Sequence, residues 1–145
     1  SFTQHGADNV SDYLADNTSE PADFVDALNT ANNIPYASDV KIAYNASGTN
    51  EEQLEQIITQ KWIAMFPDGQ EAWSEFRRTG YPRIFPVVVN NSGGTIDTDT
   101  QIRRINFVAN EVNTNGENVQ TAVSLLGGPD NGGTRLWWDK AGSNF

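Results

Sequence analysis

Residues 51–82 read EEQLEQIITQKWIAMFPDGQEAWSEFRRTGYP, and this stretch predicts two consecutive helices joined by a tight turn. In the first helix, apolar residues recur every three or four positions, which places them along one wide face. In the second helix, Ala72, Trp73 and Phe76 are expected to point inward for the same reason. The apolar face of the first helix consists of Leu54, Ile57, Ile58, Trp62, Met65 and Phe66.

Polar residues and one proline mark the ends of these two helices. Thr49 is positioned to cap the first helix, with Glu52 three residues later completing a capping box. Pro67 ends that helix, because it has no N–H to donate and its ring clashes with the preceding turn. Asp68 then caps the second helix, with Glu71 as its capping-box partner. The hairpin predicts a mainly α-helical fold.

The composition excludes several classes of protein. The chain has 145 residues and a net charge of −10, and an acidic surface repels phosphate backbones, so no nucleic-acid partner is expected. The absence of cysteine excludes a disulfide framework and a thiolate metal site. The longest apolar runs, such as residues 84–89, are far too short to span a bilayer. The modest hydrophobic content of 37% and the many Asn and Gly residues predict long loops.

Outside the hairpin, the helical signals are shorter and weaker. Residues 10–14 are expected to form one or two helical turns, and residues 21–30 a short helix or a loop. A further helix is predicted over residues 117–126, with Asn115 as its cap. Residues 1–5 have the pattern of the last turn of a helix, with a glycine cap after it.

A few short segments are predicted to run extended. In residues 39–45, Val40, Ile42 and Tyr44 alternate with other residues, which favours a short strand or an extended segment. Residues 90–100 are polar and rich in Gly, Asn and Asp, which is typical of a surface loop. The other extended segments are residues 83–89, interrupted by proline, and residues 101–107.

Catalysis is poorly supported by the sequence. Cysteine is absent, so a Cys–His site is impossible. His5 is the only histidine, so a Ser–His site would have to use this one base near a terminus. A glycosidase needs two carboxylates, for which Glu71, Glu75 and Glu111 could be nominated. Glu71 already has a capping role, however, and 19 acidic residues make a chance pair easy to find. No catalytic residue is therefore assigned.

Two acidic loops carry the oxygen ligands that hard cations prefer. They are Asp97–Asp99 and Asp130–Gly132, and neither completes a calcium loop of the helix–loop–helix type. Asx turns explain both loops. The paired glycines are not followed by a lysine at the spacing of a phosphate-binding loop. No metal and no cofactor are therefore predicted.

The four tryptophans could serve either the core or a sugar ligand, because the C–H groups of a sugar ring can lie flat against an aromatic face. Trp62 and Trp73 lie on apolar helical faces, so core packing is favoured for both. Trp137 and Trp138 are adjacent and would point to opposite sides of an extended segment. Burial is also favoured over sugar binding for this pair.

Three tyrosines are the better candidates for contact with a ligand. Tyr13, Tyr36 and Tyr44 lie in the polar first third of the chain, where loops could present their rings. They are the candidate ligand-binding residues of the chain.

The arginines are expected to form a structural ion-pair cluster. Arginine and carboxylate side chains form bidentate pairs, and both occur near the helical hairpin and in the C-terminal third. Such pairs would hold the C-terminal segments to the hairpin. The arginines are Arg77, Arg78, Arg103 and Arg104, and the expected partners are Glu71, Glu75 and Glu111.

Several motifs, in a fixed order and spacing, resemble those of one protein family. They include QKWIA at residues 60–64, EAW-x-E-x-RRTGYP at residues 71–82, RRI-x-F-x-x-x-E-x-N at residues 103–113 and LWWD at residues 136–139. With them, the chain resembles the C-terminal part of the SusD/RagB family, the nutrient-binding lipoproteins of glycan-foraging Gram-negative bacteria. Many members of that family have Tyr-Pro where this chain has Phe-Val at residues 107–108, so the extended turn there is expected to be relaxed.

The resemblance implies a fold, a location and a function. Residues 1–145 would form a single unit, an irregular α-helical C-terminal fragment from which the N-terminal helical-repeat part is absent. The whole protein would be anchored at the cell surface, in the outer membrane, by a lipid on an N-terminal cysteine. It would capture an oligosaccharide or another nutrient for a SusC-like TonB-dependent transporter, without catalytic activity. No binding residue of the family maps by motif onto this chain.

Two other functions remain open at this point. One is that the chain is a fragment of a glycoside hydrolase, which would need two of the acidic residues as a catalytic pair. The other is a helical scaffold that binds only another protein, namely the transporter. Binding of oligosaccharides would separate the receptor from the scaffold, and turnover of those sugars would identify the hydrolase.

Overall fold

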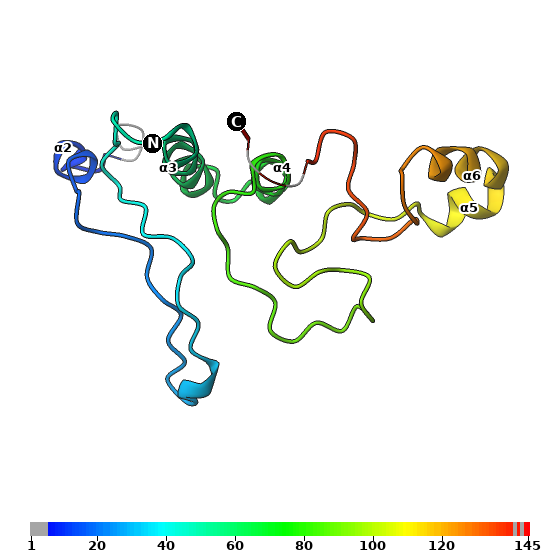
Figure 1. The fold of residues 1–145 in the computed structure, drawn as a ribbon, viewed down its shortest axis with the longest axis horizontal. Helices are drawn as coiled ribbons and strands as arrows, with labels where there is room; N and C mark the ends of the chain where they lie inside the picture. Colours follow the sequence, from blue (N-terminus) through cyan, green and yellow to red (C-terminus); the bar gives the residue numbers. More distant parts are fainter. Residues whose placement is uncertain (1–5, 141, 143) are drawn as a thin grey trace. The chain divides into compact units, whose positions relative to one another are not determined.

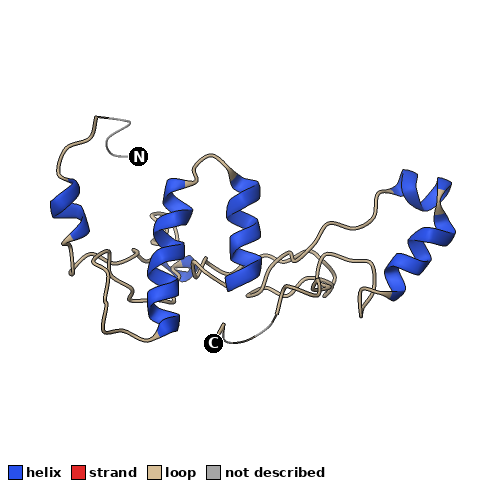
Figure 2. Ribbon diagram, turned by 90° about the horizontal axis from the view of Figure 1, so that it is seen from above, coloured by secondary structure: helices blue, strands red, loops and turns tan. Residues whose placement is uncertain are grey.

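The chain forms two compact units in a computed structural model that describes residues 6–140, 142 and 144–145. The first unit comprises Ser1–Phe85 with Ser143–Phe145, and the second comprises Pro86–Gly142. Within the described residues the fold is helical and has no strand beyond one isolated bridge, so the predicted mainly α class is confirmed (Figure 2). The helix tail predicted at residues 1–5 lies outside the described residues. The helices are α2 (Val10–Leu14), η1 (Thr30–Asn32), α3 (Asn50–Ala64), α4 (Gly69–Thr79), α5 (Ala109–Thr114) and α6 (Gly116–Ser124).

Helices α3 and α4 form the predicted hairpin of the first unit, and they lie side by side in both views (Figures 1 and 2). Their starts are as predicted: the Thr49 hydroxyl accepts the backbone N–H of Glu52 at 3.2 Å, and the Asp68 carboxylate accepts that of Glu71 at 3.1 Å. Helix α4 ends at Gly80, whose φ of 78° is a left-handed conformation that glycine adopts without steric cost.

The two capping-box glutamates direct their carboxylates elsewhere. Glu52 accepts a hydrogen bond from the Asn45 side-chain amide at 2.9 Å. Glu71 pairs with Lys61, whose Nζ lies 3.0 Å from Oε1 of Glu71 and 2.7 Å from Oε1 of Glu75. Because Lys61 lies on α3 and both glutamates lie on α4, this ion pair joins the two helices at their connected ends.

Loss of the Lys61–Glu75 pair in acid is expected to weaken the hairpin. Burial acts to raise the pKa of Glu75, but hydrogen bonds from Lys61 and Arg78 outweigh it, so the pKa is lowered from 4.5. A carboxylate with a lowered pKa contributes stability above its unfolded-state pKa, and that stability is lost as the pH falls through the folded-state value. Thermal unfolding of wild type and Glu75→Gln should therefore differ by about 0.5–1 kcal/mol at pH 7 and converge below the folded-state pKa. A difference that persists in acid would contradict this prediction.

The inward face of α3 is more polar than its sequence pattern indicates. Ile58 is buried as expected, but the neighbouring Glu55 and Gln56 are also buried. Ile57 and Phe66 belong to the predicted apolar face, yet Phe66 is 88% exposed in this chain and Ile57 is exposed as well. The burial of Gln56 has a local reason, because the loop before α3 packs on the helix through three hydrogen bonds to the Gln56 amide.

The C-terminal end of the chain returns to the hairpin. The phenol of Tyr81 donates to Oε2 of Glu51 at 2.8 Å, and Asn144 donates its backbone N–H to the same carboxylate. The Asn144 side-chain amide also reaches the backbone oxygen of Thr79 at 3.1 Å. Burial, together with the hydrogen bond to Glu51, raises the pKa of Tyr81 to about 12. These contacts tie three separate segments together.

A long irregular excursion connects α2 to α3, with η1 at its far end (Figure 1). Phe24 and Ile34 exchange two backbone hydrogen bonds there, of 2.9 and 3.0 Å. Residues 21–30 are thus a loop that ends in a 3₁₀ turn, one of the two predicted alternatives. The strand considered for residues 39–45 does not form, because backbone groups in this segment bond to the side chain of Gln56 instead of to a neighbouring strand.

The second unit contains a pair of short helices, α5 and α6, that pack on each other. Asn115 occupies the N-cap position of α6 as predicted, but its side chain makes no capping hydrogen bond, and the helix covers Gly116–Ser124 rather than residues 117–126. Helix α5 was not predicted, because its sequence ANEVNT is dominated by residues that compete with helical hydrogen bonds. The amide of Asn115 donates to Glu111 at 2.5 Å, which connects the two helices.

The arginines of the second unit have partners other than those predicted. Arg103 donates to both carboxylate oxygens of the buried Asp139, and Arg135 joins the same carboxylate. Arg104 pairs with Asp130. The predicted glutamate partners were therefore wrong for Arg103 and Arg104, and both residues use aspartates more than 20 positions away along the chain.

The predicted Asx turns form fully in the acidic loop at residues 97–99 and only in part in the loop at residues 130–132. Asp97 Oδ1 accepts the backbone N–H groups of Asp99 and Thr100 at 3.0 and 2.8 Å, which makes an Asx turn. Asn131 makes a similar turn with the residues after it. Asp130 instead binds Arg104, and this pairing lowers the pKa of Asp130.

The tryptophans differ in their surroundings. Trp62 and Trp73 are half-buried, and the guanidinium of Arg77 lies 3.5 Å above the Trp73 ring. Trp137 and Trp138 occupy a turn closed by the Asp139 N–H and the Leu136 carbonyl rather than an extended segment. The predicted burial was wrong for Trp137, which is 89% exposed, whereas Trp138 is half-buried.

Candidate ligand-binding site

The three candidate tyrosines lie in different surroundings. The phenol of Tyr13 donates to Oε1 of Gln60 at 2.7 Å, and Tyr13 is half-buried. Tyr36 packs edge-on against Phe85, with ring centroids 5.3 Å apart, and burial raises its pKa. Tyr44 is 55% exposed and is thus the most accessible of the three rings. Tyr36 and Tyr44 line different cavities.

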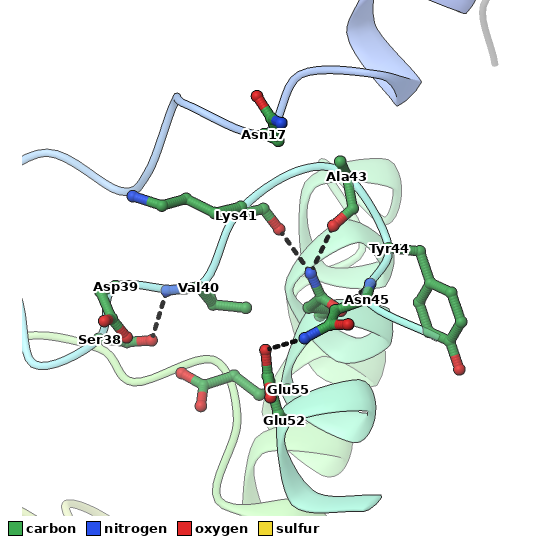
Figure 3. A pocket seen from close by; sticks show the side chains of 11 residues that line it. Asn17, Ser38, Asp39, Val40, Lys41, Ala43, Tyr44, Asn45, Glu52 and Glu55 are labelled. Atoms are coloured by element: carbon green, nitrogen blue, oxygen red, sulfur yellow. Dashed lines mark hydrogen bonds between the residues drawn. The ribbon is translucent and has the colours of Figure 1, made fainter. Parts of the chain in front are cut away.

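Tyr44 lies at the rim of a polar cavity of about 480 Å³ in the first unit (Figure 3). Its ring projects outward from the loop, away from Lys41 and Asp39 on the other side of the cavity. The remaining lining residues are Asn17, Ser38, Val40, Ala43, Asn45, Glu52, Glu55 and Gln56. The cavity therefore offers amides, carboxylates and an ammonium group next to an exposed aromatic ring.

One side chain of α3 determines the shape of the loop that carries Tyr44. The Gln56 amide nitrogen donates to the backbone oxygens of Lys41 and Ala43 at 3.0 and 2.7 Å, and Figure 3 shows these carbonyls converging. The Gln56 amide oxygen accepts the backbone N–H of Asn45 at 2.9 Å. The three hydrogen bonds hold residues 41–45 against the helix without any strand partner.

The charges around the cavity are partly paired. Lys41 forms an ion pair with Glu20. Arg83 approaches Glu55, with its Nε 3.3 Å from Oε1, yet this buried oxygen has no hydrogen bond of good geometry. Such a mixture of donors and acceptors suits the hydroxyl groups of a sugar, whose ring C–H groups pack on aromatic faces.

A second, apolar cavity of about 390 Å³ lies in the same unit. Trp62 and Ile63 of α3 line it together with Tyr36 and Phe85, and Phe24 contacts the Phe85 ring edge-on at 6.3 Å. The aromatic group around Phe85 was not found from the sequence, because residues 24, 36 and 85 meet only through the tertiary fold. Most of the surface of this cavity is apolar, although the side chains of Glu20, Lys41 and Gln60 also line it.

The carboxylates nominated for hydrolysis have structural partners. Glu71 and Glu75 both pair with Lys61, and Glu111 accepts from Asn115. His5 lies outside the described residues. Across residues 6–140, 142 and 144–145, no group of three or more His, Cys, Asp or Glu side chains is arranged to hold a metal ion.

The described part of the chain is thus a helical scaffold that places an exposed tyrosine beside a polar cavity and gives its nominated acids structural partners. The chain belongs to the SusD/RagB family, because the family model described as "SusD-like: Susd and RagB outer membrane lipoprotein" matches residues 1–139. The resemblance found in the sequence motifs is thereby confirmed, and the family is one of outer-membrane lipoproteins. Within the described part of the chain, no helix is long and apolar enough to cross a membrane.

Solved structures support the same assignment. A chitin-binding SusD homolog from Flavobacterium johnsoniae is 54% identical, with a TM-score of 0.93, over 99% of this chain and 30% of that one. A SusD homolog from Bacteroides vulgatus is 45% identical, with a TM-score of 0.89, over 99% of this chain and 29% of that one. A SusD-like protein from Bacteroides thetaiotaomicron is 41% identical, with a TM-score of 0.89, over 99% of this chain and 31% of that one. The chain thus spans about 30% of these relatives' length. No curated protein gives a significant match.

Proposed function

We propose that these residues are the C-terminal part of a longer surface receptor that captures oligosaccharides without cleaving them. The observation that carries the proposal is the 54% identity, over 99% of the chain, to a chitin-binding SusD homolog. By that similarity, the favoured ligand class is a β-linked oligomer of N-acetylglucosamine. Captured ligand would pass to a SusC-like TonB-dependent transporter in the outer membrane, to which the receptor would be lipid-anchored through its N-terminal part.

Exposed apolar side chains on α3 support a longer receptor. Ile57 and Ile63 of α3, and Phe66 just after the end of this helix, are exposed in this chain. Large apolar side chains that cluster on a surface mark places where other protein packs. In the proposed receptor, the N-terminal helical part covers this face, so that the hairpin is scaffold rather than binding surface.

Of the three tyrosines, Tyr44 is proposed as the ligand contact. Its ring is accessible, and the polar side chains of the cavity lie next to it. An aromatic ring contributes most to sugar binding when it is held rigidly and is not already engaged by other side chains of the protein. The phenol of Tyr13 is already bonded to Gln60, and the ring of Tyr36 is packed on Phe85.

Replacement of Tyr44 by alanine is expected to weaken binding of N-acetylchitohexaose about 10-fold, which corresponds to about 1.4 kcal/mol. Tyr44→Phe should bind almost as well as wild type, because the ring face rather than the hydroxyl makes the contact. Isothermal titration of the whole receptor with chitohexaose, cellohexaose and maltohexaose measures both effects. Equal affinity of wild type and Tyr44→Ala would place the site elsewhere on the receptor.

The same titration separates the alternative functions. A scaffold that binds only the transporter would bind none of the three sugars, yet would still copurify with the transporter from membranes. A hydrolase would release shorter sugars during incubation, and Glu71→Gln or Glu111→Gln would abolish that release. Binding without release of shorter sugars is the outcome expected here.

A further inference from the structure

Gln56 fixes both peptide groups that flank Tyr44. One of these groups provides the Ala43 carbonyl, which accepts from the Gln56 amide nitrogen at 2.7 Å. The other provides the Asn45 N–H, which donates to the Gln56 amide oxygen at 2.9 Å. Since the planes of these two peptide groups determine the direction of the Tyr44 Cα–Cβ bond, one side chain sets where the tyrosine points.

The environment of Gln56 makes this arrangement rigid. Gln56 is 4% exposed and extends from the middle of α3, so its position is set by a helix of four turns. Its amide nitrogen also donates to the backbone oxygen of Lys41 at 3.0 Å, so both donor hydrogens and the acceptor oxygen are used. On the other side of the loop, the backbone N–H of Ala43 donates to the Asp16 carbonyl at 2.8 Å.

We infer that Gln56 is a positioning residue for ligand binding, which acts by holding Tyr44 in its binding orientation. The inference rests on the proposed function: although Gln56 lines the cavity, the hydrogen bonds of its amide go to the loop at residues 41–45. Without Gln56, the loop at residues 41–45 samples several conformations. Only the fraction in which Tyr44 is correctly oriented then binds, so the apparent affinity falls by that fraction.

The test uses Gln56→Met in the whole receptor, because methionine has a similar length but cannot make the three hydrogen bonds. The matched control is Gln60→Met, one turn later on α3, where the glutamine accepts from Tyr13 rather than from the Tyr44 loop. Titration with N-acetylchitohexaose should show affinity about 10-fold weaker for Gln56→Met and within about twofold of wild type for Gln60→Met. Gln56→Glu, which keeps an acceptor for Asn45 but loses both donors, is the second variant and should also bind more weakly.

Hydrogen exchange provides a readout of the loop itself. The Asn45 amide should exchange at least about tenfold faster in Gln56→Met than in wild type, since its acceptor is lost. Saturation with chitohexaose should restore much of this protection, because the bound ligand selects the ordered loop. A loss of protection that ligand does not reverse would indicate a structural role only, and would overturn the inference.

A double-mutant cycle tests whether Gln56 acts through Tyr44. In the Tyr44→Ala background, Gln56→Met should change the affinity by less than about twofold, because the residue that it positions is already absent. If the affinity of the double variant instead falls by the product of the two single losses, the inference is overturned. Unchanged affinity in Gln56→Met would also overturn it. Failure of wild type to bind any of the three sugars would instead overturn the proposed function, so the two failures are distinguishable.

Discussion

Replacement of Asp139 by alanine is expected to destabilise the second unit by about 3–5 kcal/mol, the cost typical of removing one partner from a buried ion pair. The Asp139 side chain is fully buried and accepts from Nε and Nη2 of Arg103 at 2.8 and 2.6 Å. The Arg103 side chain is also buried, so the alanine variant leaves a cation without its counter-ion. Arg135 adds a third hydrogen bond, of 2.5 Å, to the same carboxylate.

Native-state hydrogen exchange is the suitable measurement, because it reports the opening free energy of one unit within a longer protein. Asp139→Ala should accelerate exchange of amides throughout residues 86–140 while leaving those of α3 and α4 unchanged. The matched control is Asp99→Ala, an exposed aspartate of the same unit, which should cost less than about 0.5 kcal/mol. Arg135→Met should have an intermediate effect, because Arg103 keeps its partner. A cost of Asp139→Ala similar to that of Asp99→Ala would show that the pair contributes little.

The parts of the fold that the sequence predicted are those specified by neighbouring residues. Thr49 and Asp68 cap the helices that follow them, and Gly80 ends α4, because each of these interactions spans at most four residues. The family, too, was identified from motifs within continuous stretches of chain. Local signals of this kind do not depend on how distant segments meet.

The parts that were missed depend on long-range contacts. Arg103 and Asp139 are 36 positions apart, and nothing in either local sequence indicates the pairing. The loop at residues 41–45 has the alternation of a strand, but its hydrogen bonds go to Gln56 on the next helix. For the same reason, the sequence could offer Tyr44 only as one of three equivalent tyrosines.

Periodicity alone also could not show which apolar residues of the hairpin are buried within this chain. Phe66 and Phe76 both occur at helical spacing in apolar patterns. Phe76 is buried, whereas Phe66 follows the end of α3 and is exposed. A pattern identifies a face that is suited to burial, but the partner that covers it can belong to another part of a longer protein.

Replacement of Phe76 by alanine is therefore expected to cost about 3–5 kcal/mol of stability in the first unit, because it removes a large buried ring and leaves a cavity. Phe76 shares the buried face of α4 with Ala72 and Thr79, four residues before it and three after it. Exchange of the α4 amides measures the loss, and amides of the second unit serve as the internal reference.

Phe66→Ala removes the same ring from an exposed position and is the matched control. If the 145 residues are prepared alone, this variant should cost less than about 0.5 kcal/mol, since little is packed around the ring. In the whole receptor, the loss of stability caused by Phe66→Ala should rise to about 1 kcal/mol or more if the N-terminal part covers this ring as proposed. A small cost in both forms would mean that the apolar surface around Phe66, just after α3, stays exposed in the receptor. The comparison of the two phenylalanines thus separates packing within this chain from packing against the rest of the protein.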